Sequence, residues 1–343
     1  MERLFSDSLE YIPQIQDMGR EEESKLLWAR GLFRQRDYVN ALAECNAALE
    51  INPQSAATHY FIALIHTETT ADELALAACH QALRCMPAMV EAKLLMGRLE
   101  SRRGNTPAAL KLYKQAFAKE PDNALILHMM GDLHRAHGDH AKALKAFRKA
   151  TKINGDQYTS FYRLAQTLLD MGKTQQAASA LASALRFRRS PTAYILLGDI
   201  LLQQQKSSAA LAEYYRALEL APHLLEGHIK AGVVLLQMKQ YILAIRQFRI
   251  SVSIDPQAVD AHFYLGKIYQ ALGKLPQAAT EYRRCLDLAP ERDDVVQELA
   301  ILEASITEPR LEIFDELFQQ ALGETERQQI SHLMFAEDAL GLT

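Results

Sequence analysis

Four histidines lie close together in the sequence, at His128, His134, His137 and His140. His134 and His137 are three residues apart, so on a helix they could face the same way and hold a metal ion such as zinc. His134 also occupies the packing position that Tyr269 takes in an equivalent stretch later in the chain. Core and surface histidines therefore account for the group, and we expect no metal site.

Gly172-Lys173-Thr174 resembles the end of a phosphate-binding loop. Such a loop also needs a glycine five residues before Gly172, where this chain has Thr167, and a preceding strand, where we expect a turn between helices. The motifs Gly-x-Ser-x-Gly, His-Glu-x-x-His and Gly-x-Gly-x-x-Gly are absent. We therefore expect no catalytic residues, no cofactor and no enzyme activity.

Cysteine occurs at four scattered positions, Cys45, Cys79, Cys85 and Cys285. No two of them form a Cys-x-x-Cys pair, which argues against a zinc site. Cys45 and Cys79 occupy equivalent positions of two successive stretches, but neighbouring helices lie about 8–10 Å apart, which is too far for a disulfide. We expect four reduced cysteines that serve packing.

The composition is that of a folded, helix-rich chain without a strong charge. The hydrophobic fraction is 49%, and glycine and proline are sparse. A net charge of −4 is too small to predict nucleic acid or an anionic membrane as the partner. No apolar run reaches the length of a membrane span. We therefore expect a cytoplasmic protein without membrane insertion.

Small residues return along the chain at an interval of 34 residues, with a single interval of 33. Three series share these steps: Ala41, Ala75, Ala109, Ala143, Ala177, Ala210, Ala244 and Ala278; Ala29, Ala63, Gly97, Gly131, Ala165, Gly198, Gly232 and Gly266; and Ala48, Ala82, Ala116, Ala150, Ala184, Ala217, Ser251 and Cys285. Two helices can approach closely only where a side chain is small. The series therefore predict a repeated helix–helix contact.

Each repeat is interpreted as two helices joined by a turn. The series that contains Ala29 lies on the first helix, and the all-alanine series lies on the second. Large residues follow the alanine by four positions and share its face, at Tyr113, Phe147, Leu181, Tyr214, Phe248 and Tyr282. Glycines mark the turn, at Gly104, Gly138, Gly172 and Gly273, and prolines end the second helix, at Pro53, Pro87, Pro121, Pro222, Pro256 and Pro290.

This pattern resembles the tetratricopeptide repeat, whose period is 34 residues. The resemblance covers residues 22–292 and implies an all-α, right-handed superhelix, or solenoid, of about eight helix–turn–helix units. The units are expected at 22–55, 56–89, 90–123, 124–157, 158–190, 191–224, 225–258 and 259–292. Because the fifth unit is one residue short and lacks the closing proline, residues 186–191 are expected to form an irregular joint and a hinge.

Three segments lie outside the repeats. Residues 293–306 begin like a ninth unit and are interpreted as a capping helix. Residues 307–343 carry an apolar stripe at helical spacing and could either cap the array or dock on a partner or in the protein's own groove. Residues 1–21 could form a short amphipathic helix or a loose tail.

The resemblance implies that first helices line a concave groove, where a partner would bind. One groove-facing row would be apolar or aromatic, and arginines would border it in the N-terminal half. The candidate partner-binding residues are Arg30, Arg34, Tyr60, Leu94, Arg98, Arg102, His128, Arg135, Tyr162, Arg163 and Phe263. Because arginine binds carboxylates in fork geometry, the ligand would be a peptide with apolar anchors and acidic flanks. The alternative is that the apolar row seals helix packing and the arginines are only solvated.

Two functions remain open on these grounds. The first is a non-catalytic scaffold or adaptor that assembles a multiprotein complex through its groove. The second is a regulatory or secretion-type chaperone that sequesters one client protein. Some family members bind the acidic C-terminus of heat-shock chaperones through groove asparagines and lysines, but this chain lacks the asparagines, so that role is not expected.

Overall fold

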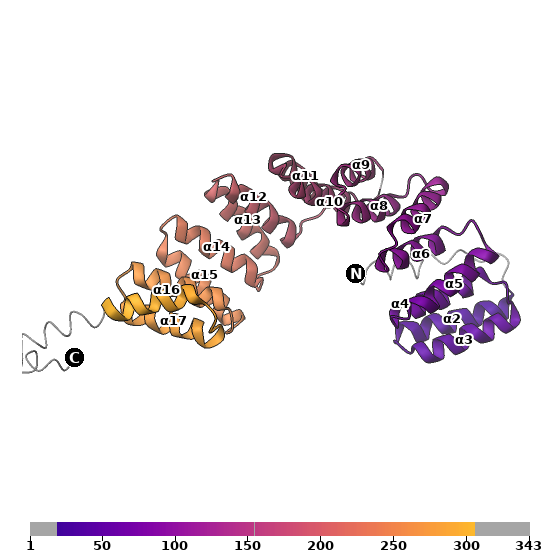
Figure 1. Cartoon of the computed structure of the whole chain (residues 1–343), viewed down its shortest axis with the longest axis horizontal. Helices are drawn as coiled ribbons and strands as arrows, with labels where there is room; N and C mark the ends of the chain where they lie inside the picture. Colours follow the sequence, from indigo (N-terminus) through magenta and orange to yellow (C-terminus); the bar gives the residue numbers. More distant parts are fainter. Residues whose placement is uncertain (1–18, 154, 306–343) are drawn as a thin grey trace, which may run out of the picture. The chain divides into compact units, whose positions relative to one another are not determined.

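A computed structural model of the chain describes residues 19–153 and 155–305. This part of the chain consists of α-helices joined by turns and contains no β-strand (Figure 1). The helices are α2 (Arg20–Arg34), α3 (Tyr38–Ile51), α4 (Ala56–Glu68), α5 (Asp72–Cys85), α6 (Val90–Arg102), α7 (Thr106–Lys119), α8 (Ala124–Ala136), α9 (His140–Ala150), α10 (Gln157–Asp170), α11 (Thr174–Phe187), α12 (Pro191–Gln203), α13 (Ser207–Leu220), α14 (Leu225–Gln237), α15 (Tyr241–Ile254), α16 (Val259–Ala271) and α17 (Leu275–Leu288), followed by a helical run over 293–305. The predicted all-α class with repeated helix pairs is confirmed.

The helices divide into two compact units, one ending at Arg189 and one beginning at Ser190. The first unit contains α2 to α11, and the second contains α12 to α17 and the run over 293–305. Within each unit, every even-numbered helix packs on the odd-numbered helix that follows it, and that helix packs on the next pair. Each unit is therefore an array of helix pairs in which contacts are made mainly between neighbours.

The division between the units falls inside residues 186–191, where the sequence predicts an irregular joint. We expect amide hydrogens of residues 180–195 to exchange faster than those of the α13–α14 connection, Ala221–Leu224, which has the closing proline Pro222. The physical reason is that no proline follows α11 at the place where Pro222 follows α13, so the connection between α11 and α12 opens at a lower free energy. Hydrogen–deuterium exchange with mass spectrometry measures this. Finding that residues 180–195 are the best-protected segment would contradict the hinge.

The turn inside each helix pair has a left-handed residue at the same place. Four are the predicted glycines, Gly104, Gly138, Gly172 and Gly273, with φ between 70° and 79°. At the other four turns the position is taken by Arg36, Thr70, Gln205 and Lys239, with φ between 58° and 63°. The next amide closes the turn on a carbonyl five residues back, for example Lys274 to Tyr269 at 2.8 Å. This bond satisfies a carbonyl group at the end of the first helix.

Thr70→Gly is expected to raise the free energy of unfolding by up to about 1 kcal/mol. A β-branched residue at positive φ costs about 1–2 kcal/mol, part of which the greater backbone freedom of an unfolded glycine offsets. Thermal unfolding followed by circular dichroism measures the change. The reverse substitution, Gly104→Thr, is the matched control and should lower the melting temperature; a Thr70→Gly protein that melts earlier than the wild type would be the contrary result.

Small first-helix residues face large second-helix residues within each pair. A Cβ added at Gly131 would lie 2.5 Å from ring atoms of Phe147, and the same clash occurs at Gly97–Tyr113, Gly198–Tyr214, Gly232–Phe248 and Gly266–Tyr282. Where the first helix has alanine, the equivalent second-helix residue is smaller than a ring, at Ala29–Cys45, Ala63–Cys79 and Ala165–Leu181. All eight second-helix residues are buried. In each pair, a larger side chain at one of these two positions is thus matched by a smaller one at the other.

The two ends of the described array differ in how they are covered. Val295 and Leu302 in the run over 293–305 are almost wholly buried against the last repeats. At the other end, Trp28 of α2 is 64% exposed, although its equivalents in later repeats, such as Leu265, pack against the preceding pair. Most of residues 1–21 and all of 307–343, whose roles were left open, lie outside the described residues.

Candidate functional site

The first helices present the candidate binding residues, but the predicted apolar row is mostly buried. Tyr60, Leu94 and His128 expose 3%, 8% and 5% of their surface. Their side chains fill the contact between successive helix pairs, because the row faces the neighbouring repeat rather than solvent. The expectation that these three residues form exposed anchors for a ligand is therefore corrected, and their burial fits the alternative that the row seals helix packing.

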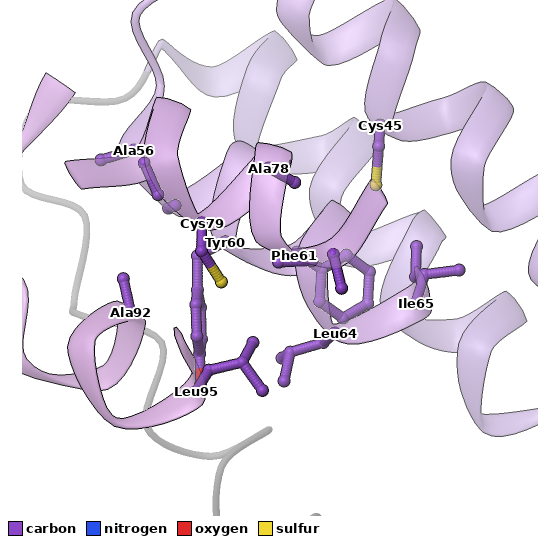
Figure 2. Packing of buried hydrophobic residues seen from close by; sticks show 14 of the residues in the cluster. Cys45, Ala56, Tyr60, Phe61, Leu64, Ile65, Ala78, Cys79, Ala92 and Leu95 are labelled. Carbon is purple, nitrogen blue, oxygen red and sulfur yellow. The ribbon is translucent and has the colours of Figure 1, made fainter. Parts of the chain in front are cut away.

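Tyr60 illustrates this burial. Figure 2 shows its side chain within the cluster of α4, α5 and α6, beside Cys79 and Leu95. Burial raises the pKa of the Tyr60 hydroxyl above its usual value, and the nearby positive charge of Arg98 only partly offsets this effect. Tyr60 therefore acts as a neutral core residue.

His128 is bound within the fold. Its Nε2 lies 2.8 Å from the Ser160 hydroxyl on the next first helix. Burial, together with the charge of Arg163, lowers the pKa of His128 to about 4. The imidazole is therefore uncharged at neutral pH, and its polar group is satisfied inside the array.

Ion pairs connect the first helices of successive repeats. Arg163 of α10 pairs with Asp132 of α8. In the second unit, Lys230 of α14 donates to both carboxylate oxygens of Asp199 on α12, each at 2.9 Å. Lys267 pairs with Glu298 at 3.6 Å in the same way. Neighbouring first helices within a unit are thus joined by ion pairs between their own side chains, here called the ladder of ion pairs.

Two further candidate arginines already hold carboxylates of this chain. Arg102 donates to Asp72 at 2.6 Å, and Arg135 lies 3.6 Å from Asp170. With Arg163, they are not the free guanidinium groups that the sequence interpretation assumed. An incoming acidic ligand would have to compete with these internal partners, which lowers its gain from each contact.

The remaining candidates keep part of their surface accessible. Arg34 is exposed, whereas Arg30 and Arg98 are half-buried. Burial and the adjacent charge of Arg34 lower the pKa of Arg30, and the Glu23 carboxylate only partly offsets this effect. The Arg30 Nε makes no hydrogen bond, so a further carboxylate would relieve the repulsion between the two arginines.

Two half-buried aromatic candidates lie in different units. Tyr162 stacks on Tyr158, with ring centroids 5.7 Å apart. In the second unit, two cations lie near the Phe263 ring, with Lys267 Nζ at 5.1 Å and the Arg292 guanidinium at 4.7 Å from its centroid. Part of each ring remains available for contact.

The repeated helix pairs also match known proteins. Models of a family described as Tetratricopeptide repeat match residues 94–158, 162–224 and 259–292. The chain is a tetratricopeptide repeat protein. The match covers parts of both units, and it agrees with the repeat that the small-residue series predict.

The chain is also similar to solved structures. Yeast Tom70 aligns over 89% of this chain and 69% of its own, with 16% identity and a TM-score of 0.51. YrrB, described as having an unusual peptide-binding site, covers 54% of this chain and 96% of its own, with 20% identity and a TM-score of 0.49. MamA covers 50% and 94%, with 24% identity and a TM-score of 0.46. No curated protein matches the sequence.

The repeats place the remaining reactive groups in unreactive surroundings. Burial raises the pKa of the Cys45 and Cys79 thiols to about 12, so both stay protonated. Gly172-Lys173-Thr174 joins α10 to α11 and follows a helix, not a strand. Among residues 19–153 and 155–305, no three metal-binding side chains lie together, and no helix is long and apolar enough to cross a membrane.

Sequence reasoning missed the ladder of ion pairs between repeats. Its signal is present in the chain: Asp132 and Arg163, Asp199 and Lys230, and Lys267 and Glu298 each lie 31 residues apart with opposite charges. A spacing three residues shorter than the repeat places both residues on facing first helices. An arginine at this spacing from a carboxylate therefore pairs with the neighbouring repeat, and a ligand would have to displace that carboxylate.

Proposed function

We propose that this tetratricopeptide repeat protein is a non-catalytic scaffold that binds a protein partner along the first helices of its repeats. The proposal rests chiefly on the arrangement of first helices within each unit, where an ion pair of Asp132 in the first unit and of Asp199 in the second joins neighbouring first helices into a face. Such a face accommodates an extended or helical segment, and adds contacts with each repeat. The residues proposed to contact a partner are Arg30, Arg34, Arg98 and Tyr162 in the first unit and, separately, Phe263 in the second.

The proposed ligand carries an acidic group near its end that meets Arg30 and Arg34. Their mutual repulsion is relieved by a carboxylate, whereas Arg102, Arg135 and Arg163 are already paired with the chain's own carboxylates. The apolar contacts of the ligand would fall on the exposed parts of Tyr162 and Phe263. We place the protein in the cytoplasm, which fits its four free cysteines.

A pull-down from the native cell tests this proposal. The double variant Arg34→Glu and Arg98→Glu should recover much less of the partner than the wild type, because two positive charges on the first helices become negative. The matched control is Arg84→Glu and Arg284→Glu, an equal charge change at exposed arginines of second helices. Equal recovery with the first-helix variant would reject the assignment.

The stoichiometry of the recovered complex distinguishes the two modes of action. An assembly scaffold holds two different partners at once, whereas a chaperone for one client forms a one-to-one complex. Light scattering coupled to size-exclusion chromatography measures the mass of the purified complex. We expect a mass that requires two partner proteins.

A further inference from the structure

Two second helices of the first unit carry only positive charge. The helix α7 contains Lys111, Lys114 and Lys119, and α9 contains Lys142, Lys145, Arg148 and Lys149. Neither helix contains an aspartate or glutamate. The chain as a whole has a net charge of −4, so the charge of these two helices is opposite in sign to that of the whole chain.

The seven side chains face solvent. Lys142 pairs with Asp139 at 2.6 Å, and among the described residues the other six have no carboxylate within ion-pair distance. In this respect they differ from the first-helix arginines Arg102, Arg135 and Arg163, which hold internal carboxylates. Their field is therefore available to a ligand.

Contacts between the helices make these cations a single surface, here called the α7–α9 basic surface. Lys149 Nζ of α9 lies 4.1 Å from the centre of the Phe117 ring on α7. Lys114 and Lys142 both act on His134: burial lowers the pKa of His134 first, and these two ammonium groups lower it further. Cations from two repeats are thus close enough to act on one ligand.

A shallow depression lies within the same surface. Its volume is about 570 Å³, and it is lined by Pro107, Leu110, Lys111, Lys114, Gln115 and Ala118 of α7. The lining is largely apolar and has two ammonium groups at hand. It has room for an apolar side chain, and carboxylates of the same ligand could meet the two ammonium groups.

The chemistry of the surface distinguishes among anionic ligands. Single-stranded nucleic acid binds through aromatic rings on which bases stack, but Tyr113 and Phe147 are buried and Lys149 covers Phe117. Membrane-surface helices insert large apolar side chains, and α7 and α9 expose none among the described residues. Lysines that leave no uncovered aromatic ring for base stacking, beside an apolar depression, suit an acidic protein segment.

We propose that the α7–α9 basic surface is a second binding site, which takes an acidic protein segment with an apolar side chain among its carboxylates. It lies on second helices, so it is separate from the first-helix site and does not depend on it. A protein with both sites can hold two partners at the same time.

Fluorescence anisotropy of the full chain tests this second site. The probe is a fluorescein-labelled peptide of twelve glutamates with one central leucine. The first comparison probe is the same peptide with serine in place of leucine, and the second is a twelve-nucleotide oligothymidylate. Phosphatidylcholine vesicles with phosphatidylserine form the third comparison. We expect the leucine peptide to bind more tightly than every comparison probe, including the serine peptide. Its affinity should fall about tenfold at high salt.

Charge reversal identifies where the peptide binds. Lys114→Glu with Lys145→Glu should weaken peptide binding about tenfold, and Lys111→Gln with Lys149→Gln should weaken it less, because charge is removed without being reversed. Arg84→Glu with Arg284→Glu is the matched control and should bind as the wild type does, and the first-helix variant Arg34→Glu with Arg98→Glu is measured for comparison. Circular dichroism verifies that each variant is folded.

The site is rejected if Lys114→Glu with Lys145→Glu binds the peptide as tightly as the wild type. It is also rejected if the oligothymidylate or the vesicles bind more tightly than the peptide, which would mean a nucleic-acid or membrane surface instead. Loss of peptide binding in the first-helix variant alone would place the acidic ligand at the first site and overturn the second.

Discussion

Phe147→Ala is expected to lower the free energy of unfolding by about 3–5 kcal/mol. The Phe147 ring is fully buried, and it lies directly over the backbone of α8 at Gly131. Its removal leaves a cavity between the two helices of one repeat, which neighbouring side chains cannot fill. Urea unfolding followed by circular dichroism measures the loss.

Phe187→Ala is the control for this substitution. Phe187 is of the same type but is 59% exposed at the end of α11, so its truncation should cost less than about 1 kcal/mol. Because repeats contact mainly their neighbours, the Phe147→Ala damage should first appear as faster amide exchange in α8 to α10. Equal losses for both variants would contradict the packing account.

Gly131→Ala is expected to cost about 1–3 kcal/mol by overpacking, since the new Cβ would lie 2.5 Å from the Phe147 ring. A compensating change should recover part of this loss. Gly131→Ala with Phe147→Leu recreates the Ala165–Leu181 pair of the next repeat, where both residues are buried. The double variant should therefore be more stable than the sum of the two single changes predicts.

A double-mutant cycle of urea unfolding gives the coupling between the two positions. Residues in direct contact typically couple by about 0.5–3 kcal/mol. We expect a coupling of that size for Gly131 and Phe147, and none for Gly131→Ala combined with the distant Phe248→Leu. Additive losses at positions 131 and 147 would show that the pair does not share one volume.

The fold could be predicted from the sequence because its determinants are repeated. A single alanine such as Ala143 says little, but the same small residue at eight equivalent positions identifies a helix–helix contact. The predicted turn glycines and closing prolines lie at turns and helix ends of the structure. Four left-handed turn residues are not glycine, and they were missed because Arg36, Thr70, Gln205 and Lys239 carry no local signal for positive φ.

The site was less predictable, because position on a first helix does not determine exposure. Tyr60 and His128 occupy the row assigned to the groove, yet the next repeat covers them. Arg163 was assigned to a ligand, but Asp132 on the neighbouring repeat already holds it. Both outcomes depend on contacts between repeats, which a pattern within one repeat does not show.

The central claim is that a partner protein lies along the first helices, and site-specific photocrosslinking in the native cell tests it most directly. A benzophenone amino acid replaces Arg34 on α2 or Gln166 on α10, and the control replaces Thr280, which is exposed on the second helix α17. We predict that both first-helix positions crosslink to the same partner and that position 280 does not. Crosslinks from position 280 with none from positions 34 and 166 would contradict the account.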